Sequence, residues 1–279
     1  MSPARQRLRA FLRNPSFLIG AALLLAILVL ALAAPLLYPA DPLDMVGSPT
    51  LWPGEDPEFP LGTDSLGRDL AAGLAYGARA SLLVGFSAAG IGLAIGIVVG
   101  ATAGYLGGWA DNLLLRLTEL FQAVPGFLLV IVLVAIGEPR LGVIAPAIGI
   151  ASWPVAARLA RAQFRSLREA DFVQAARASG SSDLAIAIRH ILPNAMPPLV
   201  VTGSIMVANA ILIEAGLSFL NLGDPNLVSW GSMMGEGRQL LRTEWYVSAL
   251  PGVAIAVTVL AVNLVGDGLN EVLNPRNGT

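Results

Sequence analysis

The side chains that most often carry covalent chemistry are nearly missing from this sequence. Its 279 residues include no cysteine and no lysine, and its one histidine is His190. A nucleotide-binding Walker A loop, a Schiff base and Ser-Lys catalysis all need a lysine. A single histidine cannot supply an HExxH zinc pair, and thiol nucleophiles, disulfides and Cys-type metal sites need cysteine. We therefore expect a chain with no catalytic residue, no metal site and no bound cofactor.

One polar segment has a composition that suits docking onto another protein. Residues 174–193 read QAARASGSSDLAIAIRHILP and lie between two apolar runs of the chain. Their small side chains form a strip that a partner can approach closely, and the nearby arginines can pair with acids on that partner. An ordinary basic loop explains the spacing equally well. The residues that we single out for docking are Gln174, Ala175, Ala176, Gly180, Ser182, Asp183, Leu192 and Pro193.

Residues 158–192 are expected to form two helices joined by a turn. The first helix is predicted to end at Gly180, because a left-handed C-cap favours glycine. The second begins at a serine cap, Ser181 or Ser182, with an aspartate in its first turn facing the positive end of the helix dipole. We expect the second helix to end at Pro193, since proline disfavours helix in the residue before it.

The composition places the chain in a membrane. Of its residues, 55% are apolar and 13% are charged, and the mean hydropathy is +0.70. A soluble domain carries about 25% charged residues, so the bilayer is the expected solvent. The formal net charge of −2 gives no reason to expect nucleic acid. Six uncharged runs approach the roughly 20 residues that a membrane-spanning helix needs; they are 17–38, 80–110, 120–137, 141–157, 191–213 and 245–266.

The arginines predict how these six spans are oriented. Twelve arginines fall on the side of the N-terminus and five on the other side, and cytoplasmic loops carry the excess of basic residues. We therefore expect an all-α, polytopic protein with six transmembrane helices and both termini in the cytoplasm. Residues 1–78 would hold a cytoplasmic tail, the first span and an external loop. Residues 79–279 would form a five-helix core with a cytoplasmic loop at 158–193.

Four glycines in the second predicted span indicate a close helix contact. Gly92, Gly96, Gly100 and Gly104 recur at every fourth residue and so share one face of a helix. Small residues at this spacing let a second helix pack closely against the backbone. We therefore expect helix packing on this face, with a substrate-lining role as the alternative.

The docking segment resembles the EAA loop found in permease subunits of ATP-binding cassette (ABC) importers. That loop reads Glu-Ala-Ala, three residues, Gly, nine residues, then an apolar residue, any residue and Leu-Pro. The residues that match are Ala175, Ala176, Gly180, Leu192 and Pro193. Gln174 replaces the glutamate, so a salt bridge from that position is not available, and His190 stands where the pattern has an apolar residue.

The rest of the chain is similar to the C-type permease subunit of dipeptide and oligopeptide importers. Six further elements occur in the order that this family has. They are Tyr38-Pro39-Ala40-Asp41-Pro42, Gly62-Thr63-Asp64 with Gly67-Arg68-Asp69, the GYxGG turn at 104–108 with Asp111, the EAxLSFLG segment at 214–221 in which Asn221 replaces the last glycine, Trp230-Gly231, and Asn263, Gly266 and Asp267 with Pro275-Arg276.

The resemblance implies a type I ABC importer permease in a bacterial or archaeal inner membrane. It implies a homologous second permease as the other half of the pore and lipid around both. It further implies two cytoplasmic ATPase subunits that carry ATP and magnesium, and an extracytoplasmic binding protein that delivers a peptide. This chain itself would not be an enzyme. Importers of nickel or of oligosaccharides share the same permease pattern.

Three residues near the outer end of the fifth predicted span are candidates for the substrate path: Glu214, Ser218 and Asn221. An acid at the centre of a lone membrane helix costs about 2.5–3.5 kcal/mol, so Glu214 should face protein or water. Its alternative role is to hold the outer loop by hydrogen bonds. The acids and arginine of 64–69 are expected to brace the outer start of the second span. A membrane-embedded hydrolase and an ion-coupled carrier are the rival classes of protein.

Overall fold

The computed structural model describes residue 11 and residues 13–273, and their regular structure is helical. Two isolated β-bridges occur in the loop 38–69. The helices, in chain order, are α2 (Pro15–Leu37), α3 (Leu70–Leu106), α4 (Gly108–Ala123), α5 (Gly126–Gly137), α6 (Leu141–Leu167), α7 (Asp171–Ala178), α8 (Asp183–Ile186), the π-helical turn η1 (Ala187–Ile191), α9 (Leu192–Phe219), α10 (Trp230–Gly237), the 3-10 turn η2 (Arg238–Leu240) and α11 (Tyr246–Leu273). The all-α prediction is confirmed.

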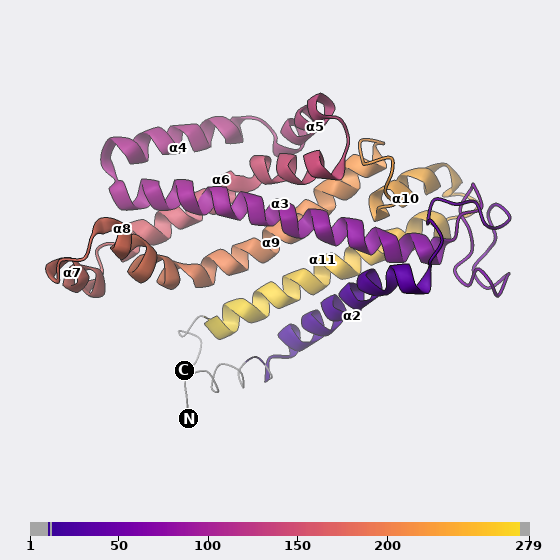
Figure 1. Ribbon diagram of the computed structural model, residues 1–279, viewed down its shortest axis with the longest axis horizontal. Helices are drawn as coiled ribbons and strands as arrows, with labels where there is room; N and C mark the ends of the chain where they lie inside the picture. The colour runs from indigo at the N-terminus through magenta and orange to yellow at the C-terminus, as the bar shows by residue number, and fades with distance from the viewer. Residues whose placement is uncertain (1–10, 12, 274–279) are drawn as a thin grey trace.

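The long helices run roughly along one axis of the molecule. Helix α3 packs along α6, α9 packs on both of them, and α11 lies between α9 and α2. Figure 1 shows α10 and the loop 38–69 at one end and α7 and α8 at the other. These are called the α10 end and the α7–α8 end below. The start of α2 and the end of α11 both lie away from the α10 end (Figure 1).

Among the described residues, five stretches are long and apolar enough to cross a membrane. They are α2, α3, α6, the continuous run from α8 to α9, and α11. A sixth crossing requires α4 and α5 together, and these helices are bent apart by 82°. The predicted span at 120–137 is therefore not one continuous helix, and its crossing of the membrane stays a prediction. Pro125 explains the bend, because proline disfavours helix in the preceding residue and Val124 is extended (φ −92°, ψ 129°).

The segment 158–193 differs from its prediction in two places. The expected single helix up to Gly180 is broken, because α6 ends at Leu167 and α7 begins at Asp171. Ala170 is extended there (φ −72°, ψ 149°), which turns α7 back so that Val173 is fully buried. The second helix does not end at Pro193 but continues through η1 into α9.

A π-helical turn explains why Pro193 is tolerated inside this helical run. Proline donates no backbone hydrogen bond, and its ring clashes with the carbonyl four residues earlier. In η1 the chain is wound more loosely, so that the backbone N–H of Leu192 donates to the carbonyl of Ala187, five residues back. The extra residue in this turn gives the proline ring the space that an α-helix would deny it.

The four glycines of α3 face α6 at close range. A Cβ atom on Gly100 would lie 2.2 Å from the carbonyl oxygen of Ala157, and one on Gly104 would lie 2.5 Å from that of Arg161. No side chain fits at such distances, so the glycines let the two backbones approach closely. Helix α3 begins at its N-cap Asp69, so the boundary drawn at residue 78 falls inside this helix.

Candidate functional site

The α7–α8 end carries the proposed docking residues on a well-defined turn. Gly180 has φ +81°. The N–H of Gly180 donates to the carbonyl of Arg177 (3.0 Å), and the N–H of Ser181 donates to that of Ala176 (3.1 Å). These two bonds form a Schellman motif, in which glycine is favoured after the helix end. Ser182 then caps α8 by accepting from the N–H of Ala185. The predicted glycine C-cap and serine N-cap are confirmed.

Three fully buried side chains anchor this turn to the long helices. Val173, Ile186 and Ile191 pack with Phe164 of α6 and with residues of α9. These contacts fix the base of α7 and α8 against the helix bundle.

The rest of α7 and α8 is largely exposed. Gln174, Ala175 and Ser182 are exposed, Asp183 is exposed beside Tyr105 of α3, and Ala176 and Leu192 are half-buried against the cluster. A Cβ atom added at Gly180 would meet nothing within 4 Å. Two large apolar side chains are exposed beside them, Phe172 at 40% and Leu184 at 70%.

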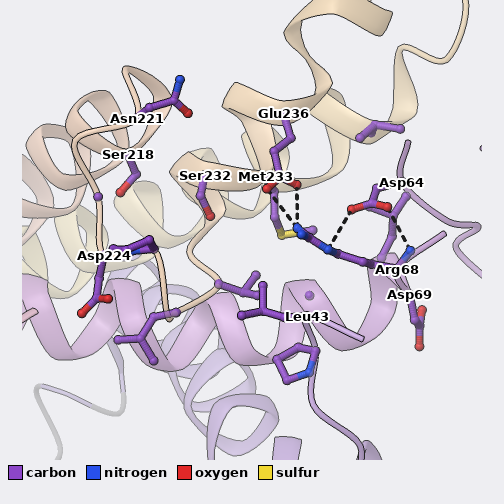
Figure 2. Close-up of a pocket in the computed structure, with 18 residues that line it drawn as sticks. Leu43, Asp64, Arg68, Asp69, Ser218, Asn221, Asp224, Ser232, Met233 and Glu236 are labelled. Carbon is purple, nitrogen blue, oxygen red and sulfur yellow. Dashed lines mark hydrogen bonds and ion pairs between the residues drawn. The ribbon is translucent and has the colours of Figure 1, made fainter. Parts of the chain in front are cut away.

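A pocket of about 250 Å³ lies at the α10 end, between the start of α3, the loop after α9, and α10. Four carboxylates and one arginine line it: Asp64, Asp69, Asp224, Glu236 and Arg68. Figure 2 shows the Arg68 side chain between Glu236 and Asp64, with a guanidinium nitrogen, Nη1, 3.0 Å from a carboxylate oxygen of Glu236. Burial is the main cause that raises the pKa of Glu236, and Arg68 opposes it.

The loop 62–69 braces the start of α3, as the sequence predicted. Asp64 accepts from the backbone N–H groups of Leu66 (2.8 Å) and Arg68 (2.9 Å). Asp69 caps α3 by accepting from the N–H of Ala71 (2.8 Å). The ion pair of Arg68 with Glu236 then ties this loop to α10, which the sequence had not indicated because the two residues are far apart in the chain.

The three candidates for the substrate path occupy different environments. Ser218 and Asn221 line the pocket at the α10 end, and Glu214 does not. Glu214 is 3% exposed, and it accepts hydrogen bonds from Ser218 (2.7 Å) and Ser81 (3.5 Å). Its carboxylate therefore ties α9 to α3, a structural role within the helix bundle and not the expected one of holding the outer loop.

Asn221 owes its position to the end of α9. Its φ is +60°. Its N–H donates to the carbonyl of Ser218, and the N–H of Leu222 donates to that of Leu217. This is a second Schellman motif, and asparagine is the common substitute for glycine in the left-handed conformation. The replacement of the family's glycine at this position is thus conformationally conservative.

Two polar contacts that the sequence did not indicate join distant segments. Asp111 of α4 forms a two-pronged ion pair with Arg161 of α6, in which Nη2 lies 2.7 Å from Oδ2. Asp224 accepts from the N–H of Leu141 (2.9 Å) and so caps α6 from another loop. The spacing along the chain gives no signal for either contact, because the partners are 50 and 83 residues apart.

Comparison with known proteins identifies the family. Residues 96–278 match the family "Binding-protein-dependent transport system inner membrane component". Residues 2–50 match the "N-terminal TM domain of oligopeptide transport permease C". The chain is similar to the di/tripeptide transport system permease protein DppC of Pseudomonas aeruginosa, with 40% identity over 99% of this chain and 93% of that protein. A putative peptide transport system permease protein of Brucella abortus is 41% identical over the same shares.

A solved structure has a similar fold. A chain of the MetNI methionine ABC transporter, in inward-facing conformations, has a TM-score of 0.58 over 72% of this chain and 96% of that one. Its identity to this chain is 19%, so the likeness shows the fold alone. The sequence matches show that the chain belongs to the family of binding-protein-dependent transport system inner membrane components, as a multi-pass permease whose N-terminal domain is of the oligopeptide transport permease C type.

Proposed function

We propose that this chain is one of two permease subunits in an ATP-driven importer of di- and oligopeptides. A homologous second permease forms the other half of the pore, and membrane lipid surrounds both. Two ATPase subunits in the cytoplasm hold ATP and magnesium and dock on the α7–α8 end. A binding protein outside the membrane delivers the peptide at the α10 end. The complex lies in the inner membrane of a bacterium or archaeon.

The observation that carries this proposal is the two-sided build of α7 and α8. One side is fixed to the bundle by Val173, Ile186 and Ile191, which are fully buried. The other side exposes the docking residues together with Phe172 and Leu184. A segment that is fixed to the bundle on one side and exposed to a partner on the other can transmit the partner's movement to the helices. We assign Gln174, Ala175, Ala176, Gly180, Ser182, Asp183, Leu192 and Pro193 to this docking surface and the turn that supports it.

Coupling to ATP then follows from where the partner binds. A partner can shift the permease between two conformations only by contacting them differently. The α7–α8 turn is joined by the chain to α6 on one side and to α9 on the other. When the ATPase subunits close around ATP, the docked turns move together and tilt these helices. ATP hydrolysis belongs to the partner subunits, and this chain supplies the moving pore wall.

The choice of peptide as solute rests on the relatives that the chain matches. Those from Pseudomonas aeruginosa and Brucella abortus are named as permeases for di/tripeptides and for peptides. We place Ser218 and Asn221 on the solute's path at the α10 end, where they line the pocket. Glu214 lies behind them and positions Ser218 by its hydrogen bond.

Uptake by the reconstituted transporter tests the solute. The chain, its second permease, both ATPases and the binding protein are placed in proteoliposomes with ATP inside or outside as orientation requires. We expect a labelled dipeptide to accumulate only with ATP, and unlabelled dipeptide to compete. ATP-dependent accumulation of labelled nickel or of a labelled oligosaccharide, but not of the dipeptide, would reassign the solute while leaving the permease role intact. Uptake driven by an ion gradient without ATPase subunits would contradict the proposal.

A matched pair of glycine variants tests the docking role. Gly180 and Gly54 both have φ near +80°, and a Cβ atom at either one meets nothing within 4 Å. Arginine at each position therefore imposes similar backbone strain, of about 1–2 kcal/mol, at opposite ends of the molecule. We expect Gly180→Arg to insert normally but to lose ATP-driven uptake, while Gly54→Arg retains it. Gly180→Asn, which tolerates this conformation, should keep most uptake; equal losses in the two arginine variants would refute the docking role.

A further inference from the structure

The turn between α3 and α4, residues 105–111, is fastened at three points. The hydroxyl of Tyr105 donates to Oδ1 of Asp183 in α8, at 2.6 Å. Nη1 of Arg168, just past the end of α6, donates to the backbone carbonyl of Tyr105, at 3.2 Å. Arg161 of α6 forms its two-pronged ion pair with Asp111. The turn thus contacts both the bundle and the docking segment.

A glycine in this turn makes one of these contacts possible. Gly107 has φ +67°, and a Cβ atom there would lie 2.9 Å from Nη1 of Arg168. Any larger residue would push away the guanidinium that holds the carbonyl of Tyr105. The GYxGG motif, which the docking proposal leaves without a role, therefore has a physical purpose at this junction.

The contact of Tyr105 with Asp183 adds a polar link between α3 and α8, which also meet through the apolar cluster around Ile186. The chain joins α8 directly to α7 and η1, and it joins neither α3 nor α4 to the docking segment. Both residues border an apolar groove of about 400 Å³ between α3 and α8, whose walls include Ile97, Ala101 and Ile188. In the part of the chain that the structure describes, this is the one hydrogen bond between α3 and α8.

We propose that Tyr105 is a positioning residue for energy coupling, which links α8 of the docking segment to α3 and α4. Movement that an ATPase imposes on α8 then reaches α3 through the Tyr105 hydroxyl, in addition to the covalent routes into α6 and α9. The ion pair of Asp111 with Arg161 keeps α4 moving with α6. This inference rests on the proposed function, because it assumes that an ATPase docks on α8.

The consequence is that α3 and α6 move together when α8 moves. Helix α3 is packed closely along α6 through its four glycines. A pull on the end of α3 therefore moves α3 and α6 as one unit. Without the Tyr105 contact, only the apolar contacts of the cluster around Ile186 link α8 to α3, so a movement of α8 reaches α3 less completely. ATP hydrolysis would then continue with less solute moved for each ATP.

The test compares two tyrosines on the same helix in the complete transporter. Tyr105→Phe removes the hydroxyl that reaches Asp183, and Tyr76→Phe removes one that donates to the carbonyl of Tyr38 (3.0 Å) at the opposite end of α3. Dipeptide uptake and ATP hydrolysis are measured together in proteoliposomes. We expect Tyr105→Phe to lower the uptake per ATP about two- to fivefold, as the loss of an exposed charged hydrogen bond allows. Tyr76→Phe should leave that ratio unchanged.

Variants of Asp183 check that the tyrosine acts through this partner. Asp183→Asn keeps an oxygen that accepts the hydrogen bond, so it should retain most of the uptake per ATP. Asp183→Ala should lower the uptake per ATP as much as Tyr105→Phe does. The double variant should lose no more than either single variant, because both remove one contact.

Three outcomes would overturn the inference. They are an unchanged ratio in Tyr105→Phe, an equal loss in Tyr76→Phe, and additive losses in the double variant with Asp183→Ala. A wild-type complex with no ATP-driven uptake would instead contradict the proposed function, and the inference that rests on it would fail as well. Since the ratio of uptake to ATP is the readout, a variant that merely inserts less well does not imitate the expected result.

Discussion

Replacing Gly100 by alanine tests the close packing of α3 on α6. The new methyl group would lie 2.2 Å from the carbonyl oxygen of Ala157 and 2.8 Å from the Cβ atom of Ala160. Ordinary contacts of this kind are about 3.4 Å or longer, so the helices must separate by about 1 Å at this point. The obstacle is backbone, which cannot rotate out of the way as a side chain can.

The magnitude follows from two opposing effects. Overpacking of a tight contact costs about 1–3 kcal/mol. Alanine in place of glycine returns up to about 1 kcal/mol of helix propensity. The net expectation for Gly100→Ala is a loss of about 1–2 kcal/mol. Gly90 lies in the same helix with nothing within 4 Å of its Cβ position, so Gly90→Ala gains propensity without the clash.

Thermal unfolding of the chain in detergent compares the two variants directly. At about 2–4 °C per kcal/mol, we expect Gly100→Ala to unfold several degrees below the wild type, and Gly90→Ala at or above it. The same order should appear in the yield of folded protein. If Gly100→Ala unfolds at or above the temperature of Gly90→Ala, the argument that glycines set the distance between α3 and α6 is refuted.

Three more predictions concern single contacts. Asn221→Gly should leave stability within about 0.5 kcal/mol, whereas Asn221→Ala should cost about 1 kcal/mol in thermal unfolding because its φ is positive; equal effects would remove the capping argument. Arg161→Ala should cost about 1–3 kcal/mol because it leaves Asp111 partly buried without its partner, while Arg165→Ala, exposed on the same helix, should change stability by less than about 0.5 kcal/mol. The pKa of Glu236 is raised, mainly by burial. The folded state therefore binds the proton of Glu236 more tightly than the unfolded chain does. The protonated side chain stabilises the fold at low pH, and this stabilisation is lost as the pH rises through the raised pKa. The stability of the wild type relative to Glu236→Gln should therefore grow as the pH falls from 7 to 5, and an opposite trend would show that the ion pair with Arg68 dominates.

Features that depend on local sequence could be predicted well. The helical class, most of the apolar spans, the glycine C-cap at Gly180 and the serine cap at Ser182 all follow from short patterns, and the structure agrees. The orientation of the spans across the membrane stays a prediction, because it depends on a charge count and not on contacts within the chain.

Features that depend on distant partners were missed or misplaced. The bend at Pro125 interrupts an apolar run whose composition alone favours a straight span. The break before α7 arises because Val173 must reach a buried cluster formed with residues of α6 and α9. The π-helical turn before Pro193 reverses the usual effect of proline, which ends a helix only where no looser turn can form. The ion pair of Asp111 with Arg161 joins residues with no local relationship.

The central claim is that the exposed surface of α7 and α8 docks on an ATPase subunit. Since the chain has no cysteine, a single introduced cysteine can carry a photo-crosslinker at one defined place. Ala178 is exposed on α7, and Asn226 is exposed in the loop after α9, at the α10 end. In the assembled transporter, Ala178→Cys should crosslink to an ATPase subunit, and Asn226→Cys should not. Crosslinking of the ATPase from Asn226→Cys, or from neither position, would contradict the account.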